Sequence, residues 1–94
     1  MHRLEARIRN AIAEGRWSFT DHADERIAER GIESWQIIEG VDEGETILID
    51  PMAKPNPKML IRQMLPDGAA VVAVWAFVKS INSAALITVY FPTK

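Results

Sequence analysis

The first part of the chain repeats apolar residues with the period of an α-helix. Four of them fall at positions i, i+4, i+7 and i+8, and they are Leu4, Ile8, Ala11 and Ile12. This spacing forms a single apolar stripe along one side of a helix. Gly15 follows the stripe and is of a type that commonly ends helices. The pattern therefore predicts a helix over residues 2–14.

Two further helices are predicted before residue 45. Thr20 or Asp21 is a good N-cap for a helix that ends at Gly31, because glycine accepts the left-handed conformation that follows many helices. Ser34 is the expected cap of a third helix, which ends at Gly44. The apolar residues expected on this third helix are Trp35, Ile38 and Val41.

After Gly44 the pattern changes to that of β-strands. Residues 58–65 alternate, with Met59 and Ile61 on one side and Lys58 and Arg62 on the other. The predicted strands are residues 46–50, 58–65, 70–78 and 84–91, and residues 17–19 are expected only as a short extended entry to the second helix. Short turns join the last three strands, which indicates an antiparallel meander. The sequence predicts an α+β fold, with three N-terminal helices packed on a four-stranded antiparallel sheet.

The length and composition indicate a single domain over residues 1–94. The absence of cysteine excludes disulfides and thiolate metal sites, and His2 and His22 are far apart in sequence, so neither a metal nor a cofactor is expected. The charged N-terminus lacks the apolar run of a signal peptide. The longest apolar run, residues 69–78, is about half of what a membrane span requires. These features predict a cytoplasmic protein without a membrane partner.

The net charge of −2 conceals an asymmetry along the chain. Residues 1–45 hold six arginines against eleven acids, a net charge of −5, whereas residues 46–94 hold five basic residues against two acids, a net charge of +3. Nucleic-acid-binding proteins are usually basic overall. The balance therefore counts against strong non-specific binding of RNA or DNA, but it permits a local cationic site.

The second predicted helix stacks three nitrogen-bearing side chains. His22, Arg26 and Arg30 are spaced at i, i+4 and i+8 beside the apolar side, and Glu29 lies close to them. Like charges at this spacing destabilise a helix slightly, so the column is easier to understand if an anion binds against it. A neutral imidazole near such an anion can act as a general base. The alternative is structural: the arginine stems cover apolar surface and their guanidinium groups pair with Glu25, Glu29 or Glu33.

Two strands carry further candidates. In the last strand, strict alternation groups Leu86, Thr88 and Tyr90 on one face and assigns the other face, with Ile87, Val89 and Phe91, to the core. Thr88 and Tyr90 are expected to line a groove against the helices, with the tyrosine hydroxyl as a donor or acid; the alternative is a half-buried strand tyrosine. Lys58 and Arg62 share one strand face and form either a basic binding strip or an ordinary solvated face.

The segment Phe19-Thr20-Asp21-His22-Ala23, followed by Glu25-Arg26 and Glu29-Arg30-Gly31-Ile32, resembles an uncharacterised bacterial family, domain of unknown function 4258. The family pattern continues with a helix, a Gly-plus-Glu break (here Gly44-Glu45) and a close like Thr88-Val89-Tyr90. The resemblance covers residues 17–91, so that residues 1–16 are an added N-terminal helix. Within this motif, the matched positions are His22, Arg26, Glu29 and Arg30.

The resemblance implies a relationship to the fold of barnase and RelE-like toxins, and with it metal-independent cleavage of RNA. The expected function is a small RelE-like ribonuclease, in one form the toxin of a toxin–antitoxin pair. His22, Arg26, Arg30, Glu29 and Tyr90 would be catalytic, and Lys58, Arg62 and Thr88 would bind. The expected partners are RNA and a cognate antitoxin or other protein. The alternative is a non-catalytic protein- or anion-binding module of the same fold, with an antitoxin, immunity or accessory role.

Overall fold

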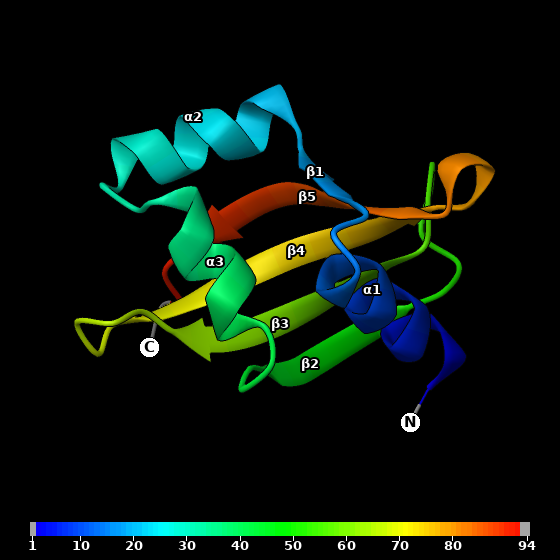
Figure 1. Cartoon of the computed structure of the whole chain (residues 1–94), viewed down its shortest axis with the longest axis horizontal. Coiled ribbons are helices and arrows are strands. Elements are labelled where there is room, and N and C mark those ends of the chain that lie inside the picture. The colour runs from blue at the N-terminus through cyan, green and yellow to red at the C-terminus, as the bar shows by residue number, and fades with distance from the viewer. Residues whose placement is uncertain (1, 93–94) are drawn as a thin grey trace.

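The computed structural model describes residues 2–92, and in this range three α-helices lie against a five-stranded β-sheet (Figure 1). The helices are α1 (Arg3–Ala13), α2 (Asp21–Glu29) and α3 (Ser34–Gly40). The strands are β1 (Trp17–Phe19), β2 (Glu45–Asp50), β3 (Lys58–Met64), β4 (Ala70–Val78) and β5 (Ser83–Tyr90), with a 3-10 turn, η1 (Lys79–Ile81), before β5. The predicted α+β class with three helices is confirmed.

The sheet differs from the prediction in one strand. Its order is β1-β5-β4-β3-β2, and the four predicted strands pair with one another in antiparallel fashion. The prediction of only four antiparallel strands is wrong, because β1 pairs in parallel with β5 and makes the sheet mixed. A three-residue segment carries no alternation that reveals a strand. Its pairing arises because the chain, on leaving α1, runs along the free edge of β5, where Phe19 lies opposite Leu86.

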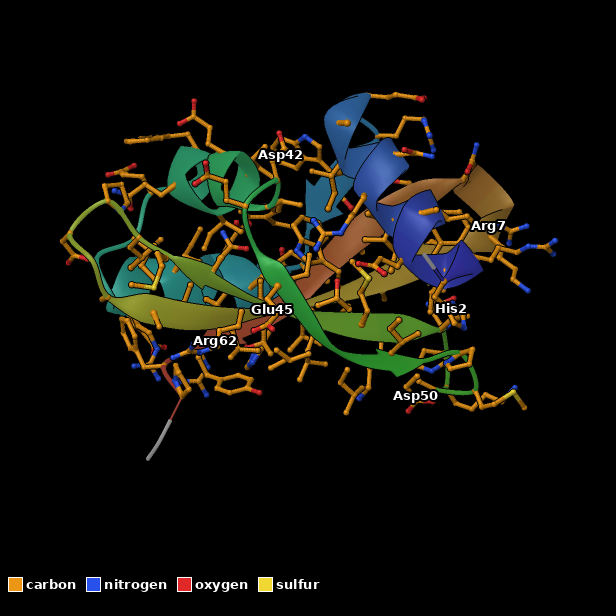
Figure 2. The ribbon with its side chains drawn as sticks, turned by 90° about the horizontal axis from the view of Figure 1, so that it is seen from below. His2, Arg7, Asp42, Glu45, Asp50 and Arg62 are labelled. Carbon is orange, nitrogen blue, oxygen red and sulfur yellow. The ribbon has the colours of Figure 1, made fainter. Side chains whose placement is uncertain are left out.

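The main core lies between one face of the sheet and two of the helices. All four residues of the predicted stripe of α1 are buried, and Ile37 of α3 is fully buried beside them. The sheet contributes Ile61 and Trp75, both fully buried. Gln63, also on this face, donates from its side-chain amide to the carbonyl oxygen of Ile37 at 2.8 Å. Helices α1 and α3 therefore cover the same face of the sheet (Figure 2).

The helix ends follow the sequence signals for α2 better than for α3. Thr20 caps α2 as predicted, and its hydroxyl accepts from the Ala23 N–H at 3.1 Å. Gly31 follows α2 with a φ of +68°, the left-handed conformation expected there. The N-cap of α3 is Glu33, not Ser34, and Trp35 is exposed. The buried side of this helix is formed by Ile37 and Val41, which are four residues apart. The predicted apolar side, which included Trp35, is therefore rotated about the helix axis relative to the side that is buried.

No helix within residues 2–92 covers the opposite face of the sheet (Figure 2). We call it the open face and define it by Arg62 of β3, Val72 of β4, and Thr88 and Tyr90 of β5. Arg62 immediately precedes Gln63, which faces the core, so the Arg62 side chain points to the opposite face of the sheet. The register pairs Arg62 with Val72 and Val72 with Tyr90, and directly opposed residues share a face.

Bulges change which residues reach the open face. Val74 pairs with Thr88, but the next residue, Trp75, pairs with Leu86. Ile87 therefore has no partner on β4 and is the extra residue of a bulge in β5. An inserted residue reverses the alternation beyond it. Leu86 is therefore fully buried in the core, and the expectation that it shares a face with Thr88 and Tyr90 is wrong. The expected core set is also wrong in part, because Val89 is buried but Ile87 is half-buried and Phe91 is exposed. A groove between these residues and α1 or α3 is excluded for the same reason, because Thr88 and Tyr90 lie on the face away from those two helices.

Candidate functional site

Helix α2 is fixed along the β5 edge of the sheet (Figure 1). The Thr20 backbone N–H donates to the Leu86 carbonyl oxygen at 3.1 Å, which extends the pairing of β1 with β5. The Thr20 hydroxyl oxygen lies 3.1 Å from the carbonyl oxygens of both Leu86 and Ile87. Ala23 and Ile27 are buried against the sheet. These contacts fix the rotation of α2 about its axis.

The arginine flank of α2 is turned toward the open face. Successive residues of a helix are rotated by about 100°, so Arg26 and Ala28 lie on opposite flanks of the buried Ile27. Ala28 lines a hollow together with Glu33 and Ser34 at the start of α3, and this is the flank toward the helical layer. Arg26 therefore lies on the flank that borders the open face.

The three nitrogen-bearing groups of the predicted column have different surroundings. Arg26 forms an ion pair with Glu29, with 3.3 Å between Nη1 and Oε2. The guanidinium carbon of Arg30 lies 5.0 Å from the ring centroid of Phe91, just beyond β5. His22 is exposed, and its side chain forms no hydrogen bond with the described residues. Since His22 precedes Arg30 by eight residues, the two are separated by about 12 Å along the helix axis.

A row of side chains crosses the open face from β2 to β5. The register aligns Glu45 with Arg62, Arg62 with Val72, and Val72 with Tyr90. Strands are spaced by about 4.8 Å, so the Cα atoms of Arg62 and Tyr90 are about 10 Å apart with Val72 between them. Val72 is only 2% exposed although no described helix covers it. Side chains from the neighbouring strands must therefore cover Val72.

The other two predicted binding residues lie on the same face, further along the strands. Thr88 pairs with Val74, and Lys58 pairs with Ala76 and, across β2, with Asp50. The structure thus brings Arg62, Thr88, Tyr90 and Lys58 onto one surface. His22 lies at the far end of α2 from the row that holds Tyr90.

Two acids on this surface were not singled out from the sequence. Glu45 lies opposite Arg62, and Asp50 lies opposite Lys58. Neither pair forms an ion pair, with a nitrogen-to-oxygen distance within 4.0 Å, in the described range. Glu45 points to the open face because a bulge between Thr46 and Leu48 reverses the alternation of β2. A bulge is a property of strand pairing, so the sequence offered no signal for this acid.

A polar cluster on the other face holds the start of β2. Arg9 of α1 donates to the carbonyl oxygens of Val41 at 2.7 Å and Gly44 at 2.9 Å, and to the Thr46 hydroxyl at 3.0 Å. The Thr46 hydroxyl in turn donates to Glu5 Oε2 at 2.7 Å. This hydrogen bond and the nearby Arg9 hold the pKa of Glu5 below its usual value. The cluster positions the strand segment that carries Glu45.

Residues 2–92 contain no group of three or more His, Cys, Asp or Glu side chains that can hold a metal ion. Nor does any helix in this range have the length and apolar character needed to cross a bilayer. The surface bordered by α2 and crossed by the Glu45–Tyr90 row is the candidate site. Its cationic groups are Arg26, Arg30, Arg62 and Lys58.

The fold and this surface define an α+β domain with one helix-covered and one open sheet face. The chain matches the family model described as "Domain of unknown function (DUF4258)" over residues 19–91. Since the match covers most of the 94 residues, the chain belongs to this family. Helix α1 lies before the matched range, whereas α2 and the open face lie within it. No curated protein and no solved structure matches the chain.

Proposed function

We propose that this chain is a small RelE- and barnase-like ribonuclease that binds the phosphodiester backbone of RNA on its open face. The observation that carries the proposal is the register that sets Arg62 and Tyr90 on either side of the buried Val72. A cation and a phenol that flank an apolar floor are suited to a phosphate with its attached ribose. The arginine flank of α2 supplies further positive charge beside this row.

The charges on this surface suit the transition state of phosphodiester cleavage. A phosphorane carries one more negative charge than the phosphodiester, and guanidinium groups bind phosphate oxygens in bidentate fashion. Arg62 and Arg30 are the cations for this role, because neither forms an ion pair with a described carboxylate. Arg26 already pairs with Glu29 and contributes less positive charge. Lys58 extends the cationic surface along β3 for a neighbouring phosphate.

The proposed reaction is transesterification. A general base removes the proton of the ribose 2′-hydroxyl, the 2′-oxygen forms a bond to phosphorus, and the bond from phosphorus to the 5′-oxygen breaks. A general acid returns a proton to the leaving 5′-oxygen, so that the products are a 2′,3′-cyclic phosphate and a 5′-hydroxyl. Tyr90 is the proposed acid. His22 or Glu45 is the proposed base; Glu45 lies in the same row as Arg62.

The test compares cleavage of mixed RNA by purified protein in EDTA, with the cyclic phosphate measured as product. We expect Arg62→Met to lower the rate about 100-fold, the usual effect of removing one preorganised donor, and Tyr90→Phe to lower it comparably. Arg3→Met, an exposed arginine of α1, is the matched control and should leave the rate unchanged. His22→Ala and Glu45→Gln identify the base. Absence of cleavage by the wild type, or equal cleavage by all variants, removes the enzymatic proposal.

A specific observation favours the alternative, a non-catalytic anion- or protein-binding module. His22, the expected base, has no hydrogen-bond partner among the described residues and lies about 12 Å along α2 from Arg30. A module of this kind would be stabilised by a short RNA or by inorganic polyphosphate without turnover. The rise in melting temperature would be lost in Arg62→Met and retained in Arg3→Met. Growth arrest on expression, relieved by Tyr90→Phe, would instead favour a toxin-type nuclease.

A further inference from the structure

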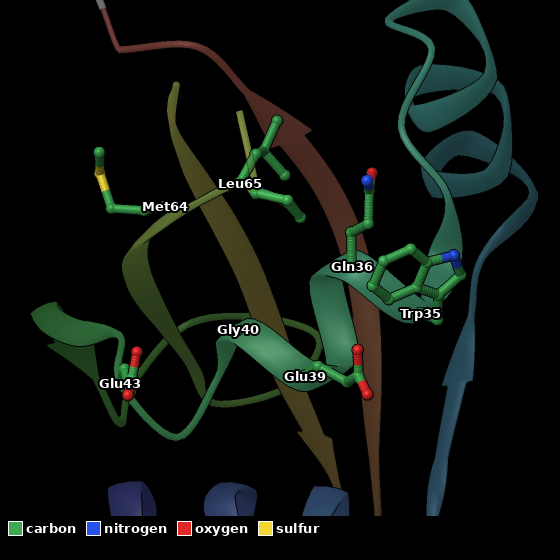
Figure 3. Close-up of a pocket in the computed structure, with 8 residues that line it drawn as sticks. Trp35, Gln36, Glu39, Gly40, Glu43, Met64 and Leu65 are labelled. Carbon is green, nitrogen blue, oxygen red and sulfur yellow. The ribbon is translucent and has the colours of Figure 1, made fainter. Parts of the chain in front are cut away.

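A second surface, unrelated to the open face, lies beside α3. A hollow of about 300 Å³ is formed by α3, the turn after it and the end of β3 (Figure 3). Its apolar lining comes from Trp35, Leu65 and Pro66, and its acidic lining from Glu39 and Glu43. The volume is at the lower end of the range for ligand pockets. Its walls therefore suit a few side chains of a partner.

One large apolar side chain at this hollow is mostly exposed to solvent. Trp35 is 53% exposed. Tryptophan is enriched in protein interfaces and is costly to leave in water. Trp35 occupies the second position of α3, where alanine or a polar residue would support the helix better. The fold alone therefore gives no reason for a tryptophan at this position.

The rim of the hollow has one sign of charge. Residues 33–43 contain four acids and no lysine, arginine or histidine. All four are exposed, and none forms an ion pair with another described residue. Glu39 lies in the last turn of α3, where the helix dipole favours a cation. Arg9 reaches the backbone carbonyls after α3 from the side of α1, but its charge is already paired with Glu5.

We propose that this hollow binds a basic, amphipathic segment of a partner protein. The apolar side of such a segment would cover Trp35 and Pro66, and its lysines or arginines would pair with Glu39 and Glu43. The negative rim disfavours RNA at this surface, because phosphates would be repelled. The site is thus distinct from the cationic open face. The proposal does not depend on the nuclease proposal: the chain can bind such a segment whether or not it cleaves RNA.

The experiment titrates the intact chain with a fluorescent helical peptide built of leucine and lysine, followed by anisotropy. We expect saturable binding that weakens about tenfold in Glu39→Lys and at least as much in Trp35→Ala, as for central interface residues. Glu25→Lys changes the net charge equally on the exposed side of α2, and Met52→Ala removes another exposed apolar side chain. These two matched controls should change affinity less than about twofold. Circular dichroism verifies that each variant is folded.

Three results would overturn the proposal. The first is that the peptide does not bind. The second is that Glu25→Lys weakens peptide binding as much as Glu39→Lys does, which would mean that only net charge matters. The third is that Trp35→Ala leaves the affinity for the peptide unchanged. Competition by a short RNA would also count against it, since that would place the peptide on the open face. Sedimentation that shows the chain dimerising through Trp35 would replace the partner protein with a second copy. Loss of RNA cleavage in Arg62→Met, with peptide binding intact, separates the two proposals.

Discussion

Replacing Arg9 by methionine is the sharpest test of how the site is supported. Methionine retains most of the apolar stem and removes the guanidinium group, which connects α1 to the segment between α3 and β2. The side chain of Arg9 is only 18% exposed, so water cannot readily replace all of its partners. The change therefore removes the Arg9 donor from the Gly44 carbonyl oxygen, and it leaves the Val41 carbonyl oxygen with the Gly44 N–H as its donor.

The expected loss follows from these contacts. A hydrogen bond that involves a charged group contributes about 1.5–3 kcal/mol net, and the bonds of one side chain are not additive. With two carbonyls, one hydroxyl and one carboxylate as partners, we expect Arg9→Met to lower the free energy of unfolding by about 3 kcal/mol. For a chain of this length the melting temperature should fall by about 15 °C. Arg9→Lys should recover only part of this, because an ammonium group cannot span two carbonyls as a planar fork does.

The assay is urea unfolding followed by circular dichroism, with the m-value as a check that the unfolded states are alike. Arg3→Met, on the same helix and exposed, is the control and should change stability by less than about 0.5 kcal/mol. If Arg9→Met costs no more than Arg3→Met, α1 is not fastened to β2 by this cluster.

Three further predictions concern the supports of the fold. The pKa of Glu5 is lower in the folded state than in the unfolded state. Its carboxylate therefore stabilises the fold above its ordinary pKa, and this stabilisation is lost as the pH falls through the folded pKa. The loss of urea stability caused by Glu5→Gln should be full at pH 7 and should shrink in acid. Gly44→Ala should lower the urea midpoint by the equivalent of about 1–3 kcal/mol, because its Cβ would lie 2.4 Å from Ile61 Cγ2. Thr20→Ala should cost about 1–2 kcal/mol by the same assay, since the cap of α2 and its contact with β5 are both lost.

Periodic patterns predicted the elements that have a long apolar stripe. The four-residue stripe of α1 and the alternation of β3 are both present as expected, because local sequence decides which side of such an element is apolar. The short α3 offers fewer apolar positions, and two stripes were compatible with its sequence. Packing against Gln63 and Ile61 of β3 selected the one with Ile37 and left Trp35 outside.

The features that periodicity could not supply are those made by strand pairing. Strand β1 exists because β5 has a free edge beside it, and nothing within three residues encodes that edge. The bulges of β2 and β5 reverse the facing of every residue beyond them. This is why Leu86 was assigned to the wrong face and why Glu45 was not noticed. Lys58 and Arg62 were grouped correctly, since the register of β3 with β4 is unbroken.

Charge separation explains how an acidic chain can present a cationic surface. The acids of residues 33–43 cluster along α3 and the turn after it, whereas Lys58 and Arg62 project from the opposite face of the sheet. Between these surfaces lies the buried core, and in physiological salt, exposed charges interact weakly beyond about 8 Å. The net charge of −2 therefore describes neither surface. Each is expected to select its ligand by its own local sign, so a charge reversal at Glu39 should leave events at Arg62 unchanged.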